Sequence, residues 1–398
     1  MHMIQVKKSI KLQLSKNLVK KIKQGHSWVY RQALRNTPNV EPGTQAILLD
    51  NRGGREVARG FYSPNSPIAL RICTTNMGEE INSNWAIRNM THALNGREAF
   101  IDSNTSGYRL FNGEGDQLPG LVCDVYGEHA VIKLDGEAAE GFWDVGAIAG
   151  WIVENLKIKT VIQKFRNPEK EKTKVLIGVE PKSPISFKEN GVQFTADILK
   201  GQKTGFFLDQ RDNRLRIQRI SKNKSVLNVF GYTGGFSVFA GLGNAKHVIT
   251  LDLAKPALEL ANQHWELNGL DSSKHKIIAA DAFEFLDENM KKGNKWDLVI
   301  LDPPSFAPSE ESLPKAILAY TKLISLGAQV TEKNGLLAAA SCSSHIGQEQ
   351  FLEICAESIS KARRKATVIG VHGQPMDHPS PLIMPELRYL KFILMKLN

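Results

Sequence analysis

Cysteine is scarce in this 398-residue sequence, and its spacing argues against two kinds of site. The four cysteines are Cys73, Cys123, Cys342 and Cys355. They form no Cys-x-x-Cys pair and have no spacing typical of metal ligands. We therefore expect no disulfide framework and no metal site, and a reducing cytoplasmic setting fits this pattern.

Long apolar segments are also lacking. The N-terminal stretch MHMIQVKKSIKLQLSK is interrupted by lysine every few residues, unlike the apolar core of a signal peptide. The one uncharged run of membrane length, residues 225–245, contains five glycines and two asparagines. This composition favours a strand, a turn and a packed helix over a transmembrane span. We expect a cytoplasmic protein with no membrane partner.

The positive charge is distributed unevenly. The net charge of the chain is +10, with 42% hydrophobic and 23% charged residues, values typical of a folded protein. Residues 1–75 contain 13 Lys and Arg against three acidic residues, so the other 323 residues sum to zero. A solubility bias is one explanation. The alternative is that the N-terminal segment docks on a polyanion such as RNA.

Strand and turn signals divide the chain into three predicted domains. Residues 1–76 combine short alternating strands with glycine turns, which favours a small β-barrel. Residues 77–187 mix helix and strand signals, indicate an α+β domain and end in a proline-containing linker. The third predicted domain covers residues 188–398, and no internal repeat is visible.

The third domain alternates strands with helices, which predicts a doubly wound parallel sheet. The predicted strands are residues 225–230, 247–253, 276–280, 298–301, 335–341, 366–371 and 389–396. The predicted helices are residues 235–241, 255–268, 282–292, 314–333 and 348–364. Because the last connection is proline-rich and not helical, the seventh strand is expected to pair antiparallel with the sixth. The fold class is therefore α/β, in the seven-stranded methyltransferase variant of the Rossmann layout.

Ligands bind such sheets at the carboxyl ends of the strands. The first strand runs into a glycine-rich turn without the G-x-G-x-x-G pattern of a dinucleotide site. Asp252, Asp281 and Asp302 follow the next three strands. Each of these aspartates has an alternative role as a helix N-cap. Together they favour a nucleoside without phosphates, with Asp252 at the ribose and Asp281 at the adenine, and S-adenosylmethionine fits that description.

Two residues of the fourth and fifth strand ends are candidates for chemistry. Asp302 precedes Pro303 and Pro304, which stiffen the loop so that its carboxylate can hold a flipped base; the alternative is an ordinary proline turn. Cys342 follows the fifth strand within Ser-Cys-Ser-Ser-His. The other cysteines are expected to be buried hydrophobes, whereas Cys342 is placed to act as a nucleophile.

These motifs, in this order, resemble one family. They are KTGFFLDQRDNR (203–214), NVFGYTGGF, LDPPSF, SCSSH, the tail motifs DHP and PELRYLK, and the N-terminal GHSWVY and ARGFYSPNSPIALRI. The chain resembles, over nearly its whole length, the ribosomal RNA large subunit methyltransferase I type, whose members join an N-terminal PUA domain to a class I methyltransferase domain. Two departures are Gly231, where members often have Ser, and Ser27, which replaces a proline.

The resemblance implies that the chain makes 5-methylcytosine in 23S rRNA with S-adenosylmethionine as cofactor. It implies Cys342 as nucleophile and Asp302 as the residue that holds the base. The cofactor-binding residues are expected to be Gln210, Arg211, Phe230, Gly231, Tyr232, Gly234, Asp252, Asp281, Ala282 and Asp302. Other RNA cytosine-5 methyltransferases have a second cysteine beside the fourth-strand proline. None stands here, so a single-cysteine scheme is predicted.

Several alternatives stay open. One alternative target is a guanine ring nitrogen or another rRNA base nitrogen, for which no thiol is needed. A second alternative is a non-catalytic RNA-binding or ribosome-assembly factor. Arg211 has an alternative role in a surface salt bridge, and Trp28 and Tyr30 either pack in the core or stack on bases. The resemblance suggests a monomer or a homodimer.

Overall fold

The computed structural model describes residues 2–5, 7–165, 173–182, 184–201, 203–307 and 309–398. The chain divides into two compact units. Unit 1 consists of Met1–Gly191, Thr195–Leu208 and Met376–Met384. Unit 2 consists of Val192–Phe194, Asp209–Pro375 and Pro385–Asn398. Each unit is built around its own sheets.

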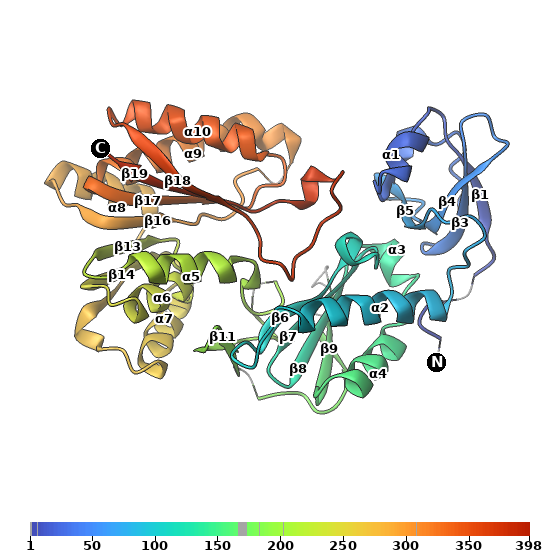
Figure 1. Ribbon diagram of the computed structural model, residues 1–398, viewed down its shortest axis with the longest axis horizontal. Helices are drawn as coiled ribbons and strands as arrows, with labels where there is room; N and C mark the ends of the chain where they lie inside the picture. Colours follow the sequence, from blue (N-terminus) through green and yellow to red (C-terminus); the bar gives the residue numbers. More distant parts are fainter. Residues whose placement is uncertain (1, 6, 166–172, 183, 202, 308) are drawn as a thin grey trace. The chain divides into compact units, whose positions relative to one another are not determined.

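The N-terminal part of unit 1 forms a five-stranded sheet with the order β1-β3-β4-β5-β2 (Figure 1). Its strands are β1 (Ile10–Gln13), β2 (Trp28–Tyr30), β3 (Thr44–Leu49), β4 (Glu56–Tyr62) and β5 (Ile68–Thr74). β1 runs parallel to β3 and the other pairs are antiparallel. The short basic helix α1 (Val19–Lys23) contributes one buried residue, Ile22, to the core of this sheet. The short strands joined by turns that the sequence predicts for this part of the chain are thus present.

A second five-stranded sheet, of order β10-β9-β8-β7-β6, forms the rest of unit 1. Its strands are β6 (Gly107–Asn112), β7 (Leu121–Tyr126), β8 (His129–Leu134), β9 (Thr160–Lys164) and β10 (Thr173–Ile177). The helices of this part are α2 (Ser83–Glu98), α3 (Glu137–Glu140) and α4 (Val145–Asn155). Tryptophan and phenylalanine side chains from α2, from α4 and from the turn before α4 pack against this sheet in one apolar core. The predicted α+β character is confirmed.

Buried arginines link the elements of unit 1. Arg97 of α2 forms a bidentate pair with Asp116, at 2.6 and 2.7 Å, and both side chains are buried. Arg71 of β5 pairs with the buried Glu114 and with Asp135. The Trp28 indole also donates to Glu114, at 2.7 Å. Trp28 is therefore held inside the unit, which favours its packing role.

A segment from the C-terminal end of the chain completes unit 1. Residues 376–384 precede the last strand in sequence, yet Asp377 is fully buried in this unit. Its carboxylate accepts from the Arg109 backbone N–H at 2.9 Å, and its carbonyl accepts from Arg97 at 2.9 Å. Gly115 lies so close to the Pro379 carbonyl that a Cβ would meet it at 1.9 Å. The DHP motif therefore has a packing role in unit 1.

Unit 2 contains a seven-stranded sheet of order β15-β14-β13-β16-β17-β19-β18. Its strands are β13 (Ser225–Val229), β14 (His247–Asp252), β15 (His275–Ala279), β16 (Trp296–Leu301), β17 (Thr331–Ser341), β18 (Ala366–His372) and β19 (Lys391–Leu397). The first five run parallel, and β19 pairs antiparallel with both β17 and β18. The predicted seven-stranded sheet with an antiparallel last strand is confirmed.

Helices cover both faces of this sheet (Figure 1). They are α5 (Arg211–Ile220), α6 (Gly235–Leu242), α7 (Lys255–Leu267), α8 (Ala282–Lys292), α9 (Leu313–Gln329) and α10 (Gln348–Lys361). Alternate residues of β16 face opposite sides, as the period of a strand requires. Val299 and Leu301 join the core beneath α8, α9 and α10, whereas Leu298 and Ile300 join the core beneath α5, α6 and α7. Both faces are apolar, as expected for a parallel sheet.

The remaining elements are short. β11 (Ile185–Glu189) and β12 (Val192–Ala196) form a two-stranded sheet. The 3₁₀ turns are η1 (Arg31–Ala33), η2 (Gly113–Asp116), η3 (Leu208–Gln210), η4 (Ser272–Lys274), η5 (Glu310–Ser312) and η6 (Pro385–Leu387).

Some local predictions are wrong. Residues 180–187, interpreted as a linker, include the start of β11, because Ile185 and Phe187 alternate with polar residues and are buried. The predicted helix of residues 314–333 ends at Gln329, and β17 begins two residues later and continues through Asn334, which has a φ of 64°. Helix α5 was not predicted, because it buries Asn213 and two arginines and so lacks an apolar stripe.

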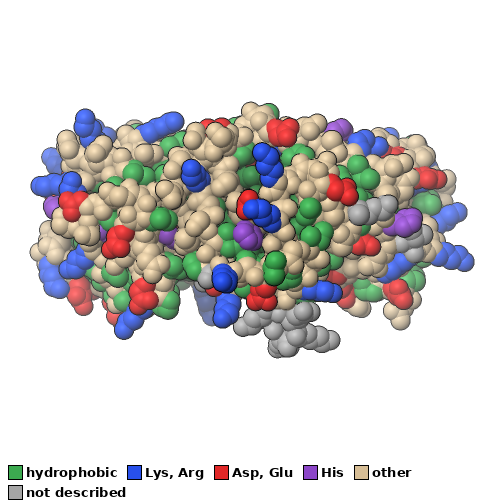
Figure 2. All heavy atoms as spheres, turned by 90° about the horizontal axis from the view of Figure 1, so that it is seen from below, with side chains coloured by type: hydrophobic (Ala, Val, Ile, Leu, Met, Phe, Trp, Pro, Cys, Tyr) green, Lys and Arg blue, Asp and Glu red, His purple; other side chains and the backbone are tan. Residues whose placement is uncertain are grey.

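The surface mixes charged and apolar side chains. Figure 2 shows one face, on which Lys, Arg, Asp and Glu side chains separate small apolar areas. Within the described ranges, no helix is long and apolar enough to cross a membrane. Nor does any group of three or more His, Cys, Asp or Glu side chains in those ranges have the arrangement of a metal site.

Candidate active site

The sheet of unit 2 collects the predicted site residues at one edge. Following the strand order from β15 to β17, the strand ends lead to Asp281, Asp252, Gly231, Asp302 and Cys342. The strand order reverses between β13 and β16, which is where doubly wound sheets bind their ligands. Gly231 and Asp302 follow these two strands, and the Asp302 N–H donates to the Val229 carbonyl at 3.3 Å.

The glycine-rich turn after β13 has an unusual backbone. Phe230 and Tyr232 have φ values of 58° and 46°, a region that residues with side chains rarely adopt. Gly231 lies between them, and a Cβ there would meet Thr250 at 2.5 Å. This contact explains glycine at a position where the resembling family often has serine. Gly234, with a φ of 79°, caps α6, and a Cβ would meet Ala261 at 2.7 Å.

Asp252 fixes the position of this turn. One carboxylate oxygen accepts from the Tyr232 backbone N–H at 2.9 Å, and the other accepts from Ala254 N–H at 2.9 Å. No Lys or Arg of the described chain forms an ion pair with Asp252. Its remaining lone pairs are therefore acceptors without a cationic partner, suited to neutral donors such as hydroxyl groups.

Asp281 caps α8 with a single oxygen. Its Oδ1 accepts from the backbone N–H groups of Phe283 and Glu284, at 2.9 and 3.0 Å. The N-cap role that the sequence left open is thus present. The cap engages only Oδ1, so a second role for Oδ2 stays a prediction. Ala282, the first residue of α8, is buried.

Asp302 is oriented by a buried amide chain. Gln210 Nε2 donates to Asp302 Oδ1 at 2.9 Å, and Gln210 Oε1 accepts from Asn213 Nδ2 at 2.7 Å. Both amides are buried, with exposures of 3% and 0%. Gln210 was predicted as a cofactor ligand, and the structure places its amide on Asp302. Asn213 was missed, because only the register of α5 brings it to this chain.

Arg211 is buried rather than exposed. Its Nε lies 3.3 Å from Asp212 Oδ1, and the side chain of Arg211 is only 5% exposed. The alternative placed Arg211 in a salt bridge on the surface. That position is wrong, because the Arg211 side chain is buried. A role for Arg211 in cofactor binding stays a prediction.

Cys342 lies in a turn that is tied to the Asp302 loop. Cys342 is half-buried, and the next residue, Ser343, is fully buried. The Ser343 hydroxyl lies 3.0 Å from the hydroxyls of Ser305 and Tyr320, and accepts from Ala307 N–H at 3.4 Å. Ser343 therefore holds the two candidate catalytic loops together. Nothing in the sequence pattern singled it out.

The other cysteines differ from Cys342. All four are free, and Cys73, Cys123 and Cys355 are buried. Burial raises the pKa of each of these three thiols, that of Cys355 to about 12. They are therefore protonated at neutral pH and shielded from a substrate, so Cys342 is the cysteine suited to nucleophilic chemistry.

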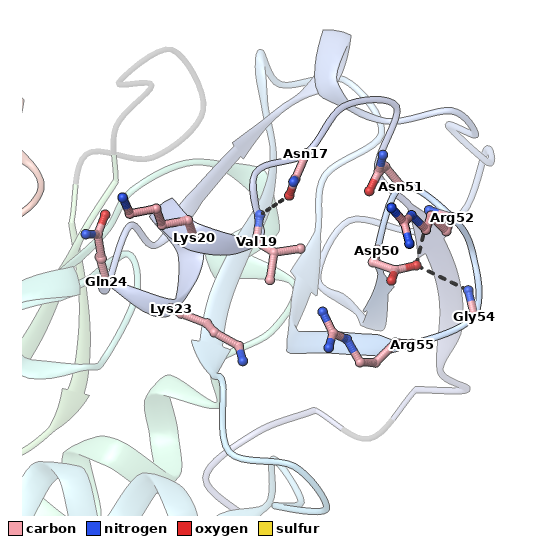
Figure 3. Close-up of a pocket in the computed structure, with 10 residues that line it drawn as sticks. All are labelled: Asn17, Val19, Lys20, Lys23, Gln24, Asp50, Asn51, Arg52, Gly54 and Arg55. Carbon is pink, nitrogen blue, oxygen red and sulfur yellow. Dashed lines mark hydrogen bonds between the residues drawn. The ribbon is translucent and has the colours of Figure 1, made fainter.

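A basic pocket lies in the N-terminal part of unit 1. α1 and the loop between β3 and β4 enclose a cavity of about 900 Å³ (Figure 3). Lys23 and Arg55 reach into the same space from these two elements. Asp50, the acid of this pocket, accepts from the backbone N–H groups of Arg52 and Gly54 at 3.2 Å.

The cations of this pocket are not neutralised by ion pairs within the described residues. In the part of the chain that the structure describes, no ion pair engages Lys20, Lys23, Arg52 or Arg55. The other two acids of residues 1–75 are engaged, Glu41 with Lys7 and Glu56 with Arg59. The positive excess of the N-terminal segment is therefore partly concentrated at a concave site, as expected for an anion-binding surface.

Comparison with known proteins identifies the family. Residues 145–365 match the family model of an S-adenosylmethionine-dependent methyltransferase, and residues 12–75 match a PUA-like domain. The ribosomal RNA large subunit methyltransferase I of Aeromonas salmonicida is 34% identical over 98% of this chain and 99% of its own length. The chain belongs to the ribosomal RNA large subunit methyltransferase I family. A ribosomal RNA large subunit methyltransferase of Deinococcus radiodurans is 35% identical, with 98% of each chain covered.

Solved structures share the fold of this methyltransferase. A putative SAM-dependent methyltransferase from Streptococcus mutans has a TM-score of 0.86 at 25% identity, covering 97% of this chain and 100% of that one. A putative methyltransferase complexed with SAH has a TM-score of 0.85 at 24% identity, covering 98% and 99%. The predicted class I methyltransferase fold with an N-terminal PUA-like domain is confirmed.

The cofactor of this family member is S-adenosylmethionine. The acceptors at the strand ends fit its nucleoside, because among the described residues Asp252 and Asp281 bond only backbone N–H groups and leave lone pairs for hydroxyl and amino donors. The backbone of the turn formed by Phe230, Gly231 and Tyr232 lies at the same edge of the sheet as these carboxylates. The individual contacts of these residues with the cofactor stay predictions.

Proposed function

We propose that this methyltransferase makes 5-methylcytosine in 23S rRNA, with Cys342 as a covalent nucleophile and Asp302 holding the base. The observation that carries the proposal is the position of Cys342. It is the half-buried cysteine of the chain, at the end of β17, beside the strand that leads to Asp302. The names of the curated relatives support ribosomal RNA as the substrate class.

A thiolate is needed because carbon 5 of cytosine is too weak a nucleophile by itself. The Cys342 thiolate adds to carbon 6, forming a carbon–sulfur bond, and the electron pair of the 5,6 double bond moves to carbon 5. Bound S-adenosylmethionine would supply the electrophilic methyl group, and its transfer to carbon 5 would break the methyl–sulfonium bond and release S-adenosylhomocysteine. Loss of the carbon 5 proton and departure of the Cys342 thiolate then restore the double bond.

Asp302 has the properties that holding the base requires. Its carboxylate is oriented by Gln210, and its backbone is followed by two prolines that restrict the loop. A carboxylate in this position accepts from the exocyclic amino group of a flipped cytosine or stabilises a proton at its ring nitrogen. The tie from Ser305 to Ser343 keeps Asp302 and Cys342 on coupled loops.

The release of tritium tests this function. We expect purified protein with S-adenosylmethionine and 23S rRNA labelled with tritium at cytosine carbon 5 to release one tritium per methyl group transferred. Methyl transfer without tritium release would move the target to a base nitrogen, such as a guanine ring nitrogen. A protein that neither transfers a methyl group nor binds the cofactor would instead be a non-catalytic assembly factor.

RNA is expected to bind the basic pocket of the PUA-like domain through its phosphates. The double variant Lys23→Gln with Arg55→Gln should weaken binding of transcribed 23S rRNA by about tenfold at 0.1 M salt. It should also flatten the slope of log Kd against log salt by about 1.5, since each lost phosphate contact removes about 0.7–0.9. Filter binding over a salt series measures both values.

The matched control removes two charges elsewhere. Lys291 and Lys292 are exposed on α8 and pair with Asp287 and Glu288. The double variant Lys291→Gln with Lys292→Gln should leave the slope within about 0.3 of the starting protein. Equal losses in the two double variants would show that the pocket is not the RNA-binding surface.

A further inference from the structure

Lys391 is a buried lysine beside the candidate nucleophile. It is the first residue of β19 and pairs in register with Ser341, the residue before Cys342. Its side chain is only 2% exposed. Its Nζ donates to the Ser343 carbonyl at 2.5 Å and to the Tyr389 carbonyl at 2.7 Å. The ammonium group therefore holds the backbone carbonyl of Ser343, while the Ser343 hydroxyl contacts Ser305 in the Asp302 loop.

The charge of Lys391 has no acidic counterpart among the residues that the structure describes. Across the described ranges of the chain, no Asp or Glu forms an ion pair with it. Burying an ammonium costs several kcal/mol unless an opposite charge compensates for it. Two carbonyls would be bridged as well by a neutral donor, so the backbone contacts alone do not account for a lysine here.

Cys342 is the titratable side chain that acts on Lys391. Burial lowers the pKa of Lys391 to about 8, and Cys342 opposes this shift. Cys342 also acts on Tyr320, whose pKa is raised by burial, so that the phenol stays neutral. At pH 7 most of Lys391 is still protonated, so it presents a positive charge at the Cys342 turn.

We propose that Lys391 is a positioning residue that ionises Cys342, holding its turn through the Ser343 carbonyl and supplying the positive charge that stabilises the thiolate. The proton of the thiol leaves to solvent before the base binds, and Lys391 stays an ammonium. An adjacent cation favours the charged form of a thiol. This inference rests on the proposed function only in assigning Cys342 the role of nucleophile.

The alkylation of Cys342 as a function of pH tests this proposal. The full-length protein is treated with iodoacetamide between pH 5.5 and 9.5, and the peptide containing Cys342 is quantified by mass spectrometry. We expect a midpoint at least about one unit below the ordinary thiol value of about 8.5. The buried Cys355 serves as an internal reference that reacts slowly throughout.

Two variants separate charge from structure. Lys391→Met should raise the midpoint by about one unit, which is about a tenfold slower alkylation at pH 7. Lys391→Arg keeps the charge and should keep the midpoint within about 0.3 unit. Cofactor binding and the melting temperature establish that each variant is folded.

The outcomes that overturn the proposal are distinct. A wild-type midpoint at or above about 8.5 would reject it, whether or not Lys391→Met folds. An unchanged midpoint in a folded Lys391→Met protein would reject it as well. Tritium release is measured separately, so a low midpoint without tritium release would reject carbon 5 chemistry and leave the role of Lys391 standing.

Discussion

Replacing Cys342 with alanine is expected to abolish tritium release and to slow methyl transfer by at least about 10⁴-fold. The variant cannot form the carbon–sulfur bond that makes carbon 5 nucleophilic, and removing a covalent nucleophile typically costs rate enhancements of this size. Cofactor binding should be unchanged within about threefold, because the strand-end carboxylates and the turn after β13 are untouched. Single-turnover methyl transfer and calorimetry with S-adenosylmethionine measure the two effects.

Cys355→Ala is the matched control for this prediction. Cys355 lies on α10 and is buried in the apolar core, with 2% exposure. Its replacement removes one sulfur from the packing and should leave tritium release within about twofold. If Cys342→Ala transfers methyl groups as fast as Cys355→Ala, the reaction needs no thiol adduct. That result would favour a base nitrogen as the target.

The arrangement of the strand ends could be predicted from the sequence because it depends on local signals. Alternating apolar strands and helices define the order of a doubly wound sheet, and its carboxyl ends meet at one edge. Asp252, Asp281 and Asp302 follow those ends directly. Their common location therefore needed no knowledge of packing, and the strand order confirms it.

What the sequence could not predict depends on contacts between distant segments. Gln210 meets Asp302 across 92 positions of the chain, and Asp377 meets the Arg109 backbone across 268. Helix α5 was missed because its buried face is polar. Such polar contacts carry no periodic signal, since their partners are chosen by tertiary packing.

Ser343 and Lys391 also make contacts between distant segments, here beside the candidate nucleophile. The hydroxyl of Ser343 reaches the Asp302 loop, and its carbonyl accepts from Lys391. A displacement of either loop is thus transmitted to Cys342 through one buried residue. Enzymes need reacting groups held at close tolerance, and contacts of this kind supply that precision. The strand pattern predicts the two candidate catalytic side chains, whereas their relative position depends on the residues around them.

Replacing Asp302 with asparagine is expected to slow methyl transfer by about 10³-fold while preserving the fold. The amide oxygen of asparagine can still accept from Gln210 Nε2, so the side chain keeps its orientation and loses only its negative charge. A neutral amide cannot stabilise a proton at the cytosine ring nitrogen, and losing such a group typically costs 10²–10⁴-fold. Cofactor affinity should fall by less than about tenfold.

Asp297→Asn provides the same substitution at the other end of the same strand. Asp297 lies on β16, and its carboxylate accepts from the Ser225 backbone N–H and hydroxyl at 2.8 Å. This variant should lower stability by about 1–2 kcal/mol, because the two Ser225 donors bind a charged carboxylate more strongly than a neutral amide oxygen, and should keep methyl transfer within about threefold. If Asp302→Asn were equally active, the charge at the end of β16 would be dispensable. Asp302 would then hold the base by hydrogen bonding alone, a role that an amide fills as well as a carboxylate.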